Sequence, residues 1–121
     1  MIRCAIHAIE QTYGGYHGVE RFIVGDFENY EDACECARET SLELMEDYGI
    51  DSKFAEEAIE EGIEEDSDEF YDYVAECRED NIDFGLWKIK DGVKESNADL
   101  QNKFWNNKDD FVKTYCENFE I

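Results

Sequence analysis

Positive charge is what this sequence lacks most. Its 121 residues include 11 lysines and arginines against 33 aspartates and glutamates, which gives a formal net charge of −22 at pH 7. A chain with so few cations repels nucleic acids and anionic membranes and is attracted to basic surfaces. We therefore expect neither direct nucleic-acid binding nor membrane binding, and the preferred partner is a basic protein.

Long apolar segments are also missing. No run of 18 apolar residues occurs, and the segment from Met1 to Cys4 lacks the layout of a signal peptide. The five cysteines are odd in number, which is typical of reduced thiols rather than of a secreted disulfide framework. These features favour a soluble, cytoplasmic protein.

Motifs for catalysis and metal binding are missing as well. The sequence has only two histidines and no Cys-x-x-Cys pair, Walker loop or nucleophile elbow. Cys34 and Cys36 are two residues apart on a predicted helix, so they point about 200° away from each other and cannot chelate one metal ion together. We expect no enzymatic activity, no cofactor and no dedicated metal site.

Hydrophobic residues make up 42% of the chain, enough for one folded domain spanning residues 1–121. Alternating apolar residues predict strands over residues 2–10, 19–25 and 82–90. The chain has no proline, and Gly and Asn supply the turn signals between these elements.

Helical spacing of apolar residues predicts a helix from Asn29 to Gly49, with Asn29 as its N-cap, and more helix over 52–79, as one helix or two. Two short helices follow, the first beginning at Ser96 or Asn97 and the second after the Asn106-Asn107 pair. The order β-β-α-α-α-β-α-α predicts an α+β fold. We expect a small, mainly antiparallel three-stranded sheet with helices packed on one face, and the acidic helical segment 28–80 inserted between strands.

The negative charge is concentrated in that segment. Residues 28–80 contain 22 acidic side chains and three basic ones (Arg38, Lys53 and Arg78), so they hold 19 of the 22 net negative charges. A salt-adapted surface would spread its acids over the whole chain, and this uneven distribution argues against that origin. The acidic segment is therefore the candidate binding surface.

Within this segment the carboxylates follow a helical period. If 52–79 is one helix, acids four residues apart form two neighbouring rows, and the preceding helix adds further acids. The first row is Glu56, Glu60, Glu64, Asp68, Asp72 and Glu76, the second is Glu57, Glu61, Glu65 and Glu69, and the preceding helix contributes Glu35, Glu39, Glu43, Glu46 and Asp47. Each like-charged neighbour at this spacing destabilises a helix by about 0.2–0.5 kcal/mol. Two interpretations stay open: the acids form a surface that binds a partner, or they form a solvated face that only confers solubility.

A loop with aromatic residues supports a second hypothesis. Residues 12–18 contain Tyr13, Tyr16 and His17 among three glycines. This composition is typical both of a wide hairpin loop and of a ligand-binding loop. In the latter interpretation the chain is an immunity protein or adaptor that recognises one cognate partner. A third hypothesis is a small-molecule or metal-binding domain centred on His7, His17 and the cysteines.

In its size, its charge and its lack of catalytic motifs, the chain resembles small acidic inhibitors of phages and mobile elements. These are the antirestriction and anti-CRISPR proteins that imitate nucleic acid. The resemblance covers the acidic segment 28–80 and is one of composition. It implies an inhibitor that places the 56–76 acidic band in the nucleic-acid groove of a basic protein, through protein–protein interaction alone.

Overall fold

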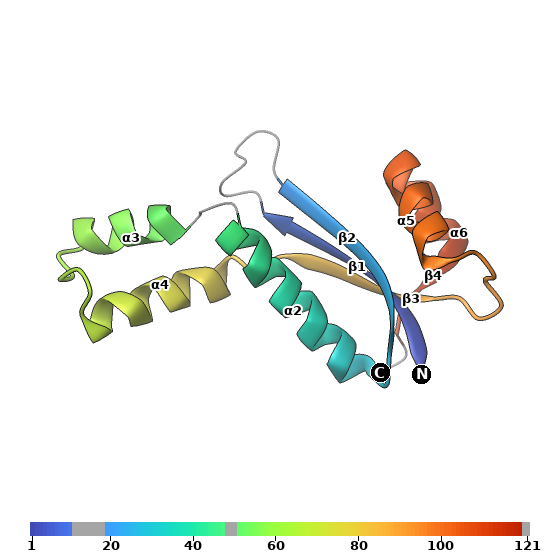
Figure 1. Cartoon of the computed structure of the whole chain (residues 1–121), viewed down its shortest axis with the longest axis horizontal. Coiled ribbons are helices and arrows are strands. Elements are labelled where there is room, and N and C mark those ends of the chain that lie inside the picture. The colour runs from blue at the N-terminus through green and yellow to red at the C-terminus, as the bar shows by residue number, and fades with distance from the viewer. Residues whose placement is uncertain (11–18, 48–50, 120–121) are drawn as a thin grey trace.

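The computed structural model describes residues 1–10, 19–47 and 51–119 (Figure 1). Strands and helices follow one another along the chain in the order predicted, with one further strand at the end. The elements are β1 (Ile2–Glu10), β2 (Val19–Phe27), α2 (Tyr30–Asp47), α3 (Asp51–Glu60), α4 (Asp68–Asp80), β3 (Phe84–Ile89), α5 (Asn97–Asn106), α6 (Lys108–Tyr115) and β4 (Cys116–Glu117). No helix within the described residues is long and apolar enough to cross a membrane.

The sheet is antiparallel and has four strands in the order β2-β1-β3-β4. β1 lies between its neighbours, with Ile6 opposite Ile23 on one side and Leu86 on the other. The predicted number of three strands is wrong because β4 adds a short fourth strand, in which Cys116 pairs with Ile89. A strand of two residues is too short to produce a period of its own, so the sequence pattern does not reveal it.

Helices cover both faces of the sheet, so the prediction that they pack on one face is wrong. Ala5, Phe22 and Val24 belong to a buried cluster with α5 and α6, which contribute Leu100, Phe104 and Phe111. Side chains alternate along a strand, so the neighbours of Ala5 in β1 point to the other face. That face is covered by α2, which lies against β1, β2 and β3.

Side-chain caps fix where the helices begin. Asn29 Oδ1 accepts a hydrogen bond from the backbone N–H of Asp32 at 2.8 Å, which confirms Asn29 as the N-cap of α2. Ser96 caps α5 in the same way by accepting from Asp99. Asn107 ends α5 and also caps α6, accepting from the N–H of Asp110. The predicted helix starts at Ser96 or Asn97 and after the Asn106-Asn107 pair are therefore confirmed, with Ser96 as the N-cap and Asn97 as the first residue of α5.

The segment 52–79 contains two helices, α3 and α4, joined by a tight turn. Gly62 has a φ of +84°, and the N–H of Ile63 bonds to the carbonyl of Ala58 while that of Gly62 bonds to Ile59. This pattern is a Schellman motif, which ends α3. Ser67 then starts α4 by accepting a hydrogen bond from the N–H of Phe70.

The helical pair α3–α4 has its own small core. Phe54 and Ala58 of α3 are buried with Phe70 and Val74 of α4 and with Met45 near the end of α2. Figure 1 shows the pair extending beyond the end of the sheet, opposite to α5 and α6. We call α3, the turn 61–67 and α4 together the acidic hairpin.

Candidate functional site

The chain reversal at 61–67 changes the geometry of the predicted acidic band. Glu56 and Glu60 lie on α3, whereas Asp68, Asp72 and Glu76 lie on α4. Since α3 and α4 double back on each other, the condition of one helix over 52–79 is not met, and the acids do not form one continuous row along a single helix. The physical reason is Gly62, whose positive φ ends α3 after Glu60.

In place of that row the acidic hairpin presents two shorter ones. Asp68, Asp72 and Glu76 are four residues apart on α4, so they share one face and repeat about every 6 Å. Glu56 and Glu60 have the same relationship on α3. The turn between the helices is acidic too, and the other predicted hairpin residues, Glu57, Glu61, Glu64, Glu65 and Glu69, lie in α3, in this turn and at the start of α4.

Nearly all of these carboxylates face solvent. Of the ten predicted residues from Glu56 to Glu76, nine are exposed, and only Glu57 is half-buried. Burial is the main cause of the raised pKa of two α4 residues, Tyr73 and Cys77, and the negative charge of Glu57 makes a smaller contribution to both. Glu57 therefore lies against α4, and the other nine carboxylates can meet a partner.

The acidic side chains of the hairpin also affect Tyr71 at its tip. The hydroxyl of Tyr71 donates a hydrogen bond to Asp66 Oδ1 at 3.0 Å. That bond and the charge of Asp66 raise the pKa of Tyr71, with a smaller contribution from Glu65. Tyr71 is 58% exposed, so an aromatic ring is accessible among the acids at this end of the molecule.

The acids of α2 extend the negative surface toward the sheet. Glu35, Glu39, Glu43, Glu46 and Asp47 are all exposed. Two of them are partly neutralised by Arg21 of β2, whose guanidinium nitrogens lie 2.8 Å from Asp47 Oδ2 and 3.7 Å from Glu43 Oε2.

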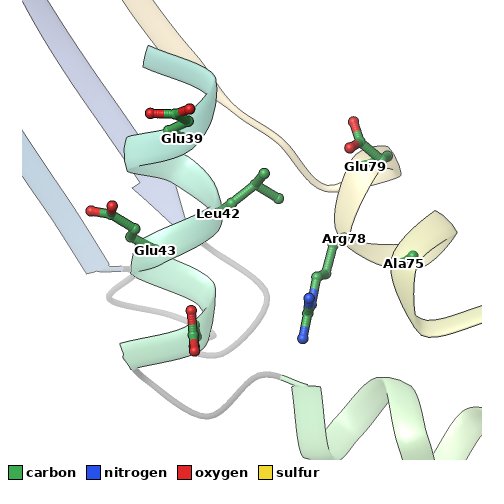
Figure 2. Close-up of a pocket in the computed structure, with 7 residues that line it drawn as sticks. Glu39, Leu42, Glu43, Ala75, Arg78 and Glu79 are labelled. Atoms are coloured by element: carbon green, nitrogen blue, oxygen red, sulfur yellow. The ribbon is translucent and has the colours of Figure 1, made fainter. Parts of the chain in front are cut away.

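A groove of about 270 Å³ separates α2 from α4 (Figure 2). Figure 2 shows Leu42 reaching from α2 toward α4, and Arg78 extending from α4 alongside the same space. An ion pair between Arg38 of α2 and Glu79 of α4 joins the two helices. The groove is lined by Glu39, Leu42, Glu43 and Glu46 of α2 and by Ala75, Arg78 and Glu79 of α4.

Sequence reasoning missed this groove, although part of its signal was present. Glu39, Glu43 and Glu46 follow i, i+4 and i+7 spacing, which places them on one face of a helix. The spacing did not indicate that α4 lies beside that face, because it did not decide whether 52–79 forms one helix or two helices with a reversal at 61–67. The groove depends on that reversal.

A hydrogen-bonded cluster of His7, Glu20 and Lys108, away from the acidic hairpin, was also not predicted. His7 Nε2 lies 2.7 Å from Glu20 Oε1, and Lys108 Nζ lies 2.7 Å and 2.9 Å from the two oxygens of the same carboxylate. In the hairpin of β1 and β2, His7 pairs with Phe22, so Glu20 is its diagonal neighbour on the same face. The register of the two strands would have indicated the contact.

The residues of the second hypothesis, Tyr13, Tyr16 and His17, lie outside the described residues, so that hypothesis stays a prediction.

All five cysteines carry free thiols. Burial raises the pKa of Cys4 to about 11 and that of Cys116 to about 12. Across residues 1–10, 19–47 and 51–119, no three His, Cys, Asp or Glu side chains are grouped so that they could hold a metal ion.

Comparisons with protein-family models, with curated proteins and with solved structures give no match for this chain.

Proposed function

We propose that this protein is an acidic inhibitor that occupies the nucleic-acid-binding surface of a basic protein, in the manner of antirestriction and anti-CRISPR proteins. The observation that carries the proposal is the acidic hairpin, a projecting pair of helices on which nine of ten predicted carboxylates are exposed. Its action is binding alone, without covalent chemistry, and it takes place in the cytoplasm.

The arrangement of the acids supports imitation of nucleic acid. The row on α4 repeats about every 6 Å, comparable with the spacing of neighbouring phosphates along one strand. α3, which carries Glu56 and Glu60, packs against α4 in the opposite direction. A basic groove that binds nucleic acid contacts mainly phosphate oxygens, and carboxylate oxygens can accept the same hydrogen bonds from lysine and arginine.

The shortage of neutralising cations supports the same proposal. Within residues 28–80 only Arg38, Lys53 and Arg78 are basic, and Arg38 is already paired with Glu79 near the base of the hairpin. The field at the hairpin therefore stays strongly negative. Such a field raises the rate of association with a basic surface and makes affinity fall steeply with salt.

The experiment is affinity capture on the immobilised protein from nuclease-treated cell extract, with elution in a salt gradient. The test variant is Glu60→Lys, Glu64→Lys, Asp68→Lys, which reverses three exposed charges at the tip of the hairpin. Its matched control is Asp26→Lys, Asp91→Lys, Asp109→Lys. Those three residues are also exposed and lie outside the hairpin.

The control is matched in two respects. Both variants change the net charge by the same amount, and each contains one residue in the first turn of a helix, Asp68 in α4 and Asp109 in α6. The proposal predicts that the wild type and the control retain the same basic protein and that the hairpin variant loses it. Equal retention by all three proteins would show that the acidic hairpin is only a solvated surface.

A further inference from the structure

The groove between α2 and α4 combines an apolar floor with an acidic rim. Leu42 is half-buried and points toward α4, and Ala75 lines the opposite wall without a bulky side chain. Glu39, Glu43 and Glu46 stand along the α2 side. An apolar floor with carboxylates beside it suits a side chain that has both a hydrocarbon stem and a positive head.

Guanidinium groups already gather around this groove. Of the four arginines in the chain, Arg78 lines the groove, Arg38 pairs with Glu79 on its wall, and Arg21 contacts Glu43 on its rim. None of the seven lysines is among the residues that line it. Two carboxylates of this surface, Glu43 and Glu79, are thus already paired with guanidinium groups of the protein itself.

We infer that the groove receives an arginine side chain of the basic partner, with its stem over Leu42 and Ala75 and its guanidinium beside the α2 carboxylates. This inference rests on the proposed function. It adds one specific side-chain contact to an electrostatic attraction that otherwise acts at long range. Arginine fits better than lysine because its planar guanidinium donates two parallel hydrogen bonds to one carboxylate and is more weakly hydrated.

Two short peptides of equal charge test the inference without knowledge of the partner. The probes are acetylated, amidated tetra-arginine and tetra-lysine, titrated into the full-length protein by calorimetry at fixed salt. The test variant is Ala75→Phe, which fills the groove from an exposed position and leaves every carboxylate in place. The control variant is Ala98→Phe, at an exposed position on α5.

We expect the wild type to bind tetra-arginine about tenfold more tightly than tetra-lysine, the effect of one added hydrogen-bonded charge contact. Ala75→Phe should remove most of this preference with little change for tetra-lysine, and Ala98→Phe should keep it. The same preference in Ala75→Phe and Ala98→Phe would overturn the inference. So would equal binding of the two peptides by the wild type.

Arg78 provides a second test, because it lies in the space that the partner's arginine would enter. Arg78→Ala should raise the affinity for tetra-arginine, and the resulting affinity should be about three times that of Lys53→Ala. Lys53→Ala is the control because it removes the same charge from an exposed site on α3. An equal or smaller rise for Arg78→Ala would contradict the inference.

Failure of the groove and failure of the proposed function give different results in the capture experiment. If Ala75→Phe captures the partner as well as the wild type does while the hairpin charge-reversal variant loses it, the groove inference is wrong and the inhibitor proposal stands. If the charge-reversal variant also retains the partner, the proposed function itself is wrong.

Discussion

Arg38 of α2 and Glu79 of α4 form an ion pair between helices that are otherwise separated by the groove. The two residues are 41 positions apart in the chain, and their side chains are 49% and 48% exposed. The pair joins α4, the returning arm of the acidic hairpin, to the helix that covers the sheet. It therefore helps to set the direction in which the hairpin projects.

Removing this ion pair should affect the hairpin more than the whole protein. Exposed ion pairs contribute about 0–1 kcal/mol, so Arg38→Gln should lower the free energy of unfolding by less than about 1 kcal/mol. Local opening of α4 should become more frequent, which hydrogen exchange measured by mass spectrometry would detect. A uniform increase in exchange over β1 and α4 would contradict this role.

The main core depends on the contact between Phe104 of α5 and Phe22 of β2, whose stacked rings have centroids 3.7 Å apart. Phe104 is 1% exposed, so Phe104→Ala should cost about 3–5 kcal/mol of unfolding free energy, measured by urea denaturation. The neighbouring Trp105 is 47% exposed, and Trp105→Ala should cost clearly less. Equal losses would show that α5 does not pack on the sheet in this orientation.

Glu20 should contribute a pH-dependent part of the stability. Its hydrogen bond with Lys108 and, to a smaller extent, that with His7 lower the pKa of Glu20 below its ordinary value of 4.5, against the opposing effect of partial burial. The unfolded chain then binds this proton more readily than the folded one does. The stabilisation is therefore fully present above about pH 4.5 and is lost as the pH falls through the lowered value.

Urea unfolding of the wild type and Glu20→Gln between pH 3 and pH 7 tests this contribution. The wild type should be the more stable protein at neutral pH, and the difference should shrink as the pH falls below about 4.5. A difference that stays constant over the whole range would show that the carboxylate of Glu20 is not held by Lys108 and His7.

The cysteines should react in an order set by burial. The thiolate is the reactive form, and burial raises the pKa of Cys4 to about 11 and that of Cys116 to about 12. Iodoacetamide under native conditions should therefore modify Cys34 and Cys36, which are only half-buried, before Cys4 or Cys116. Peptide mass mapping gives the order, and early labelling of Cys116 would contradict its place in the core.

Local signals in the sequence were sufficient for much of the fold. The alternation in residues 2–10 and the caps Asn29, Ser96 and Asn107 identified elements that the structure contains, because strand periodicity and N-capping depend on residues close in sequence. The burial of both sheet faces was not predicted. The apolar residues of β1 occur on both faces, and a local pattern does not tell which helix covers which face.

The acidic residues of the candidate site stay a prediction, and their arrangement in space was not predicted. The acidic residues were identified from composition, which needs no structure. Their arrangement depends on Gly62, whose positive φ ends α3, and the helical spacing over 52–79 did not decide between one helix and two. With the chain reversed there, one long row becomes two short rows, and α4 comes to lie beside α2.

If the protein imitates nucleic acid, the acidic hairpin and nucleic acid compete for one surface of a basic protein. The most direct measurement takes the protein captured from extract, binds it to the immobilised wild-type chain, and adds increasing amounts of single-stranded DNA, double-stranded DNA or RNA. We expect one of these nucleic acids to displace the captured protein completely, and the inhibitor to displace that nucleic acid in the reverse experiment. A ternary complex, in which the captured protein holds nucleic acid and the acidic hairpin at once, would contradict it.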